Sequence, residues 1–170
     1  MLLDLGDLHV RSWRKADLDA LLRHANNPKI AANLRDQFPY PYTRRDAIDY
    51  LTFVRDQKPE RAFALEHQGE AIGGLGFQIG IDIARVSAEM GYWVSEAYWG
   101  RGFASRAAEA LSEWAFAEYK LTRVFALVFA HNVASIRVLE KAGFQREGTL
   151  RRSAVKNGVV LDQLLFAKIR

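Results

Sequence analysis

Short runs in which apolar and polar residues alternate predict β-strands along the chain. Such runs cover Leu8 to Arg14, Arg61 to His67, Ala71 to Ile79 and Ser87 to Val94. The stretch from Val124 to Phe129 is apolar throughout, which is typical of a strand covered on both faces. Asn157-Gly158 predicts a tight turn between two final strands. The pattern therefore predicts seven strands.

Apolar residues at helical spacing predict four helices. They cover Leu18 to Ala25, Thr43 to Val54, Ala104 to Ala115 and Ala134 to Lys141. Asp17 is expected to cap the first, Thr43 and Asp46 form a capping box on the second, and Gly143 ends the last. Lys29 to Tyr42 is expected to be irregular. A strand–helix–strand unit from Ser87 to Phe129 favours an α/β fold on a mixed sheet.

Within the strands, two details bear on function. Gly73, Gly74 and Gly76 are expected to weaken strand pairing or to let another backbone approach closely. In the strand from Ser87 to Val94, Met90 and Tyr92 share one face, whereas Glu89, Gly91 and Trp93 share the other.

Length and composition narrow the class of protein. The 170 residues fit one domain, residues 1–170, and 49% hydrophobic with 26% charged residues excludes intrinsic disorder. The chain has no cysteine, which excludes disulfides, thiolate metal sites and a cysteine nucleophile. Asp4 and Asp7 stand where a signal peptide needs basic residues, and no apolar run approaches the ~18 residues of a membrane span. We expect a cytoplasmic protein without a membrane partner.

The charge of the chain is mildly basic, at +4. Such an excess suits a nucleic acid, an acidic surface or a phosphorylated cofactor, and equally a solvated surface. No run of five or six like charges is present, so a basic tail that binds nucleic acid is absent and no nucleic-acid partner is expected. The four histidines lack metal-ligand spacing, so no metal is expected.

A glycine-containing segment between a strand and a helix is the strongest candidate for ligand binding. In Trp99-Gly100-Arg101-Gly102-Phe103-Ala104, the glycines let backbone N–H groups face a phosphate at the start of the helix, or merely tighten the connection. The nucleoside-triphosphate loop is excluded because no Gly-Lys-Ser/Thr string follows. The dinucleotide fingerprint fails because Ser105 replaces its third glycine and no acidic residue ends the next strand.

Over essentially its whole length the sequence resembles the GNAT superfamily of N-acetyltransferases, most closely the branch of ribosomal-protein-alanine N-acetyltransferases. The matching segments are Arg11 to Leu18, Phe38 to Thr43, Glu89 to Val94, Tyr98 to Ala104, Asn132 to Ser135, Val138 to Phe144, and Asn157-Gly158 with Asp162. Two positions depart from the pattern. Trp99 stands where the loop usually has Gln or Arg, and Leu139 replaces a tyrosine that protonates the leaving thiolate in many relatives.

The resemblance implies that acetyl-CoA is the acetyl donor and lies between two splayed parallel strands. It implies that the cofactor is held by Val94, Arg101, Gly102, Phe103, Ala104, Ser105, Asn132 and Ser135. Arg106 is a weaker candidate for the phosphates. Asn132 would hold the pantetheine arm and Ser135 would bind the thiolate, although either residue could instead cap the helix that follows.

Acetyl transfer also needs a base, an oxyanion donor and an acceptor pocket. Glu89 is the candidate base; otherwise it is a surface carboxylate or the packing partner of an arginine. A backbone N–H near Val94 is the candidate oxyanion donor. Phe38, Tyr40 and Trp93 are expected to wall the acceptor pocket, or to belong to the core.

These roles describe an N-acetyltransferase acting by direct attack in a ternary complex. The expected acceptor is a protein or peptide N-terminal amine, with a polyamine or aminoglycoside as the alternative. A non-catalytic acyl-CoA-binding module is a third interpretation. Similar proteins commonly form dimers, so a second copy of the chain is an expected partner.

Overall fold

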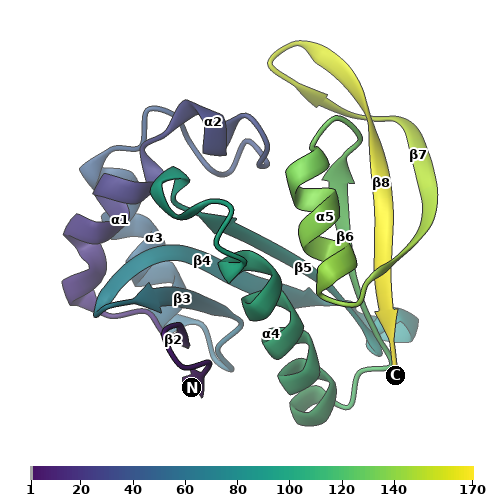
Figure 1. Cartoon of the computed structure of the whole chain (residues 1–170), viewed down its shortest axis with the longest axis horizontal. Coiled ribbons are helices and arrows are strands. Elements are labelled where there is room, and N and C mark those ends of the chain that lie inside the picture. The colour runs from purple at the N-terminus through teal and green to yellow at the C-terminus, as the bar shows by residue number, and fades with distance from the viewer. Residues whose placement is uncertain (1) are drawn as a thin grey trace.

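The computed structural model describes residues 2–170, and these form one eight-stranded sheet with helices on both faces (Figure 1). The strands are β1 (Leu2–Asp4), β2 (His9–Ser12), β3 (Ala62–His67), β4 (Glu70–Ile79), β5 (Ser87–Val94), β6 (Arg123–Phe129), β7 (Gln145–Lys156) and β8 (Val159–Ile169). The α-helices are α1 (Leu18–Ala25), α2 (Pro28–Ala31), α3 (Arg44–Asp56), α4 (Phe103–Tyr119) and α5 (Val133–Lys141). Three short 3-10 turns add Lys15–Asp17, Asp82–Ala84 and Glu96–Tyr98.

The sheet is mixed, and its single parallel pair lies at its centre. The strand order among the described residues is β1-β2-β3-β4-β5-β6-β8-β7, and only β5 and β6 run parallel. Their pairing is short, since it joins Ser87–Glu89 to Arg123–Phe125 and goes no further. Beyond that point the two strands diverge, which opens a gap between them (Figure 1). We call this gap the splay.

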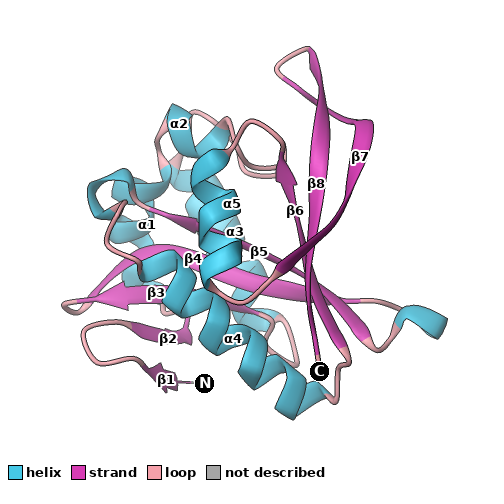
Figure 2. Cartoon of the chain, turned by 45° about the vertical axis from the view of Figure 1, so that its right-hand side comes forward, coloured by secondary structure: helices cyan, strands magenta, loops and turns pink. Residues whose placement is uncertain are grey.

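Two hydrophobic clusters lie on opposite faces of the sheet. On one face α4 packs through Phe103, Leu111 and Phe116 against strand residues that include Val124 of β6. On the other, α1 and α3 pack through residues such as Leu21 and Leu51 on β3 and β4. Figure 2 shows α4 and α5 on the same side of the sheet, with the long β7–β8 hairpin projecting beyond it.

The sequence pattern predicted most of these elements and missed two. The strand–helix–strand unit of β5, α4 and β6, the mixed sheet and the Asn157-Gly158 turn are confirmed. The predicted count of seven strands and four helices is wrong. The three residues of β1 are too short to show alternation, and the single turn of α2 lies in a stretch that was expected to be irregular.

Helix termini give one confirmed and one wrong prediction. Thr43 and Asp46 form the expected capping box, with the Thr43 N–H donating to Asp46 Oδ2 at 2.7 Å. Asp17 makes no cap on α1. Its carboxylate turns back to accept the Arg14 N–H at 2.7 Å and two bonds from Arg11, because a buried guanidinium needs a counter-charge more than a helix end needs a cap.

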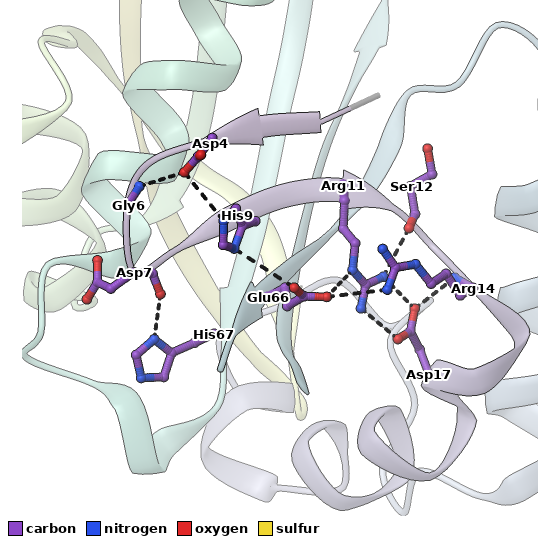
Figure 3. A network of polar contacts seen from close by, with 10 residues as sticks. All are labelled: Asp4, Gly6, Asp7, His9, Arg11, Ser12, Arg14, Asp17, Glu66 and His67. Carbon is purple, nitrogen blue, oxygen red and sulfur yellow. Dashed lines mark hydrogen bonds and ion pairs between the residues drawn. The ribbon is translucent and has the colours of Figure 1, made fainter. Parts of the chain in front are cut away.

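Arg11 is the centre of a buried polar network that joins β2, β3 and the start of α1 (Figure 3). Its side chain is 3% exposed and binds both oxygens of Asp17 at 2.8 Å, the Ser12 carbonyl at 3.0 Å, and the Glu66 carboxylate of β3. Burial tends to lower the pKa of Arg11, but Asp17 and Glu66 raise it above its usual value, so the guanidinium stays charged. The matching segment from Arg11 to Leu18 is thus structural.

Candidate active site

The splay exposes backbone N–H groups of β5. The Ser95 N–H donates to the Ile72 carbonyl at 2.8 Å, so the ladder between β4 and β5 is hydrogen-bonded at that pair. Alternation along an antiparallel ladder therefore turns the N–H groups of Tyr92 and Val94 away from β4 and into the splay. Strand β6 offers them no carbonyl, because its pairing with β5 ends at Glu89 and Phe125. These N–H groups can donate to an oxyanion in the gap.

The glycine segment forms an open loop at the start of α4. Gly100 and Gly102 both have φ of +76°, and no atom lies within 4 Å of where a Cβ would stand on either. Gly102 is the N-cap of α4 and provides no side-chain cap, so the first N–H groups of the helix have no intrahelical partner. Left-handed glycines, open space and unpaired N–H groups would suit a pyrophosphate.

Side chains around the loop differ in how they fit the expected roles. Trp99 donates its indole N–H to the Val94 carbonyl at 2.8 Å, so it ties the loop to the end of β5. Arg101 lies over the Phe103 ring, 4.8 Å from its centroid, and stays beside the loop. Arg106 turns away to Asp7, at 2.8 Å, and to the Leu5 carbonyl. The expected phosphate role of Arg106 is therefore not supported.

The side chains of Phe103, Ala104 and Ser105 are not free to bind a phosphate. The Phe103 side chain is buried in the core, and the Ser105 hydroxyl donates to the Gly102 carbonyl at 3.1 Å. Ala104 carries only a methyl group. Any hold of these three residues on a phosphate would therefore come from their N–H groups.

At the start of α5, three polar residues form a chain that reaches β5. Asn132 Oδ1 accepts the Ser135 N–H at 3.1 Å, which confirms the capping alternative for Asn132. The Ser135 hydroxyl lies 2.7 Å from the Tyr92 hydroxyl, and Tyr92 also contacts the Ser135 carbonyl at 3.3 Å. Burial raises the pKa of Tyr92 to about 12, although its bond to Ser135 acts to lower it. Tyr92 is therefore protonated near neutral pH and can donate to Ser135.

Leu139 is a core residue of α5. It is 1% exposed and packs within the cluster under α4. Leu139 has no hydroxyl. The hydroxyl of Tyr92, from β5, lies beside Ser135 at the start of the same helix.

Glu89 stands at the last paired position of β5, where the splay begins. Its carboxylate, 27% exposed, forms an ion pair with Arg35 from the segment after α2. Glu89 thus has the arginine partner that was expected as the alternative to a catalytic base. Since Glu89 pairs with Phe125 across parallel strands, these two side chains share a face, and that face is opposite to the one covered by α4.

A pocket of about 310 Å³ lies on the same face as Glu89. It is lined by residues 34–36, by Leu127 and Phe129 of β6, and by residues 154–156 and 163 of the β7–β8 hairpin. Phe125, Leu127 and Phe129 are only half-buried, so the prediction that β6 is covered on both faces is wrong. Leu127 and Phe129 line the pocket, because the α1 and α3 cluster packs on β3 and β4 and includes no residue of β6.

The three aromatic residues expected in the acceptor pocket do not act as one wall. Phe38 packs edge-on against Trp93, with centroids 5.6 Å apart, and both join the cluster under α1 and α3. Tyr40 is 53% exposed. Phe38 and Trp93 are half-buried and pack against this cluster, in agreement with the core alternative. The Trp93 carbonyl would lie 2.4 Å from a Cβ on Gly73, which confirms the predicted close backbone approach at that glycine.

The histidines have local structural partners. His67 Nδ1 lies 2.7 Å from the Asp7 carbonyl, and His24 bridges Ser95 and Glu70 at 2.9 and 3.0 Å. Within residues 2–170 no three His, Asp or Glu side chains gather as a metal site, and no helix is long and apolar enough to span a membrane.

Sequence reasoning missed Arg35, Lys156 and the hydroxyl of Tyr92. Arg35 lies in a stretch without periodicity, 54 residues from its partner Glu89. The sequence placed Tyr92 only on the face of its strand that it shares with Met90. Strand alternation was the signal that could have found it, because Glu89 and Tyr92 point to opposite faces of the sheet.

The family comparison agrees with this geometry. The model of the acetyltransferase (GNAT) domain matches residues 7–145. The chain is 31% identical over 166 residues to YdaF of Bacillus subtilis, provisionally named a ribosomal N-acetyltransferase, covering 98% of this chain and 84% of that protein. It is 29% identical over 151 residues to spermidine N(1)-acetyltransferase of Escherichia coli, covering 88% and 78%.

Solved structures with bound coenzyme A share the fold. RimJ of Mycobacterium smegmatis, in complex with a CoA disulfide, aligns with a TM-score of 0.85 and 26% identity over 95% of this chain and 81% of its own. RimL, a ribosomal L7/L12 α-N-protein acetyltransferase in complex with coenzyme A, aligns with a TM-score of 0.88 and 22% identity over 99% and 98%. The chain belongs to the GNAT family and is an acetyl-CoA-dependent N-acetyltransferase.

Proposed function

We propose that this enzyme acetylates the α-amino group of a peptide or protein N-terminus by direct attack within a ternary complex. The position of Glu89 is the observation that carries the proposal. Its carboxylate stands at the splay on the face of the 310 Å³ pocket, opposite to the face covered by α4 and α5. Donor and acceptor can therefore approach the gap from opposite sides of the sheet.

Glu89 is the proposed base. Its carboxylate accepts the proton of the attacking amine, directly or through water, once Arg35 has moved away from it. Proton removal by a positioned carboxylate contributes about 10²- to 10⁴-fold to rate. The amine then attacks with its lone pair free.

Val94 is the proposed oxyanion donor, since its N–H points into the splay. A preorganised donor of this kind contributes about 3 kcal/mol to transition-state stabilisation. On the opposite side, Ser135 would donate its hydroxyl proton toward the leaving sulfur, and Tyr92 would donate to Ser135 in turn. This pair takes the place of the acid that Leu139 cannot provide.

The donor site would be formed by the α4 loop and the start of α5. The backbone N–H groups from Arg101 to Ser105 would hold the pyrophosphate, with the guanidinium of Arg101 beside it. The capping bond of Asn132 uses only its Oδ1 atom, so its NH₂ group would bind the pantetheine arm. Acetyl-CoA supplies the thioester.

A small amine is the second candidate acceptor, favoured by the similarity to spermidine N(1)-acetyltransferase. The charge of the pocket argues against a polyamine. Its lining includes Arg35 and Lys156 but one carboxylate, Asp36, and this carboxylate is already paired with Lys156 at 2.8 Å. A polycation would therefore find no spare negative charge there, whereas a single α-ammonium needs only Glu89.

Release of CoA from acetyl-CoA tests the proposal. A thiol-reactive dye reports only product, because the chain has no cysteine. Amidated peptides with free N-termini, spermidine, aminoglycosides and free amino acids form the panel, and we expect the peptides to have the highest kcat/KM. If spermidine is the best acceptor, the peptide proposal is wrong. Intact acetyl-CoA binding without release for any amine would instead indicate a non-catalytic module.

The role of Glu89 is tested in the same assay. Glu89→Gln should lower kcat about a hundredfold or more while acetyl-CoA affinity is kept. Glu109→Gln, an exposed position on α4, is the matched control and should behave as wild type. Equal kcat in Glu89→Gln and wild type would remove Glu89 from the mechanism.

A further inference from the structure

The segment 33–36, which we call the strap, is held across the splay by three side-chain contacts. Asn33 Oδ1 lies 3.2 Å from His131 Nε2 in the β6–α5 connection, Arg35 pairs with Glu89 of β5, and Asp36 pairs with Lys156 of β7 at 2.8 Å. These contacts reach three separate elements around the pocket. The strap therefore lies where an acceptor must enter to reach Glu89.

In both ion pairs the strap contributes the exposed partner. The side chains of Arg35 and Asp36 are 64% and 82% exposed, whereas those of Glu89 and Lys156 are 27% and 10% exposed. An ion pair with one solvated partner is weak and exchanges readily. A cation as little exposed as that of Lys156, in contrast, is destabilised when no counter-charge lies beside it. Lys156 thus requires a carboxylate, but that carboxylate need not be the one of Asp36.

Arg35 and Asp36 are neighbours in the chain and carry opposite charges. Together they place a cation on Glu89 and an anion on Lys156. An acceptor with an ammonium and a nearby carboxylate carries the same two charges, and it could replace both strap residues at once. The apolar side chains of Leu34, Leu127 and Phe129 also line the pocket and suit the stem between the two charges.

We propose that the acceptor is an amine that carries a carboxylate close to its reactive ammonium, as in a peptide N-terminus followed by an acidic residue. Its ammonium takes the place of Arg35 on Glu89, and its carboxylate takes the place of Asp36 on Lys156. The strap side chains move into solvent when it binds. This inference rests on the proposed function, since it uses Glu89 as the group that receives the amine.

Matched peptides test the carboxylate preference. The probes are the C-terminally amidated tripeptides Ala-Glu-Ala, Ala-Gln-Ala and Ala-Lys-Ala, and free glutamate as the small-molecule source of the same two charges. We expect kcat/KM to be about tenfold higher for the Glu peptide than for the Gln peptide, and lowest for the Lys peptide. Glutamate as the best acceptor would identify a small molecule as the source. Equal kcat/KM for the three peptides and no rate on glutamate would overturn the inference.

Variants of Lys156 assign the preference to this site. Lys156→Gln should bring the Glu-to-Gln ratio of kcat/KM close to one, and Lys156→Glu should reverse the preference in favour of the Lys peptide. Lys58→Gln, at an exposed position between α3 and β3, is the control and should keep both the rate and the ratio. An unchanged ratio in both Lys156 variants would refute the role of Lys156.

A variant that is expected to gain affinity distinguishes the inference from a loss caused by misfolding. Asp36→Asn removes the internal competitor for Lys156, so KM for the Glu peptide should fall severalfold more than KM for the Gln peptide. A rise in KM for the Glu peptide would show that Asp36 is not a stand-in for the acceptor.

Binding separates this inference from the proposed function. In calorimetry with the protein and CoA, the Glu peptide should bind about tenfold more tightly than the Gln peptide. If neither peptide is acetylated but this binding preference holds, the proposed reaction fails and the carboxylate site stands. If both peptides are acetylated equally and bind equally, the proposed reaction stands and the carboxylate site fails.

Discussion

Replacing Arg11 by methionine tests whether the network of Figure 3 holds the fold together. The change keeps an unbranched apolar stem but removes the charge from a side chain that is 3% exposed. Asp17 and Glu66, whose side chains are 8% and 14% exposed, would lose their main counter-charge. Breaking one side of such a buried pair costs about 3–5 kcal/mol.

The remaining contacts of the network set which end of that range applies. Asp17 keeps the Arg14 N–H at 2.7 Å, and Glu66 keeps the Arg14 guanidinium at 3.7 Å. We therefore expect Arg11→Met to lower the free energy of unfolding by about 3 kcal/mol, the lower end. For a domain of this size each kcal/mol lowers Tm by about 2–4 °C, so Tm should fall by about 6–12 °C.

Urea denaturation followed by circular dichroism measures this loss directly. Arg45→Met is the matched control, because Arg45 forms an exposed pair with Asp49 at 2.9 Å and such pairs contribute at most about 1 kcal/mol. The network lies away from the splay, so kcat of folded Arg11→Met should match wild type. A loss of stability no larger than that of Arg45→Met would refute the reasoning, and so would a large loss of kcat without unfolding.

Three further predictions concern the donor side and its titration. Tyr92→Phe should lower kcat about tenfold with little change in KM for acetyl-CoA, because it removes one hydrogen bond to Ser135. An unchanged kcat in steady-state assays would show that Tyr92 does not assist Ser135. Burial raises the pKa of Tyr92 to about 12. The unfolded chain therefore loses the Tyr92 proton at lower pH than the folded chain does. The stabilisation by neutral Tyr92 should be complete below about pH 10 and should vanish as pH rises through 12. Urea titrations of wild type and Tyr92→Phe across this range would show the difference, and parallel curves would contradict it. Gly102→Val should abolish acetyl-CoA binding. Its control is Gly6→Val, at an equally open position with φ of +82°, which should lower stability by a similar amount and keep binding. Calorimetric affinities that fall equally in both variants would refute a pyrophosphate site at Gly102.

The local conformation of the α4 loop and of the start of α5 could be predicted from the sequence, because both depend on regular elements and their ends. A glycine segment between a strand and a helix is a local signal, and Gly100 and Gly102 do adopt the left-handed conformation that it requires. The same is true of Asn132, whose cap on α5 depends only on residues three positions apart. Short-range geometry of this kind can be read from spacing alone.

The acceptor side could not be predicted in the same way. The apolar run of β6 looked like a strand buried on both faces, because an aliphatic pocket wall and a core wall have the same composition. Leu127 and Phe129 are half-buried because the helices on that face pack on β3 and β4, and the reach of a helix layer leaves no mark on the hydropathy of β6. Arg35 and Asp36 lie in an irregular segment, and their partners are 54 and 120 residues away.

The same difference explains how one fold can serve different amines. The proposed donor site uses backbone N–H groups of the α4 loop and of β5, so it would tolerate sequence change wherever a positive φ does not require glycine, as it does at Gly100 and Gly102. The proposed acceptor pocket is lined by the strap, by Leu127 and Phe129 of β6 and by the β7–β8 hairpin, so each of its charges is a side chain on an exposed or projecting element. A change of sign at residue 36 or 156 would alter the preferred acceptor without touching the donor site.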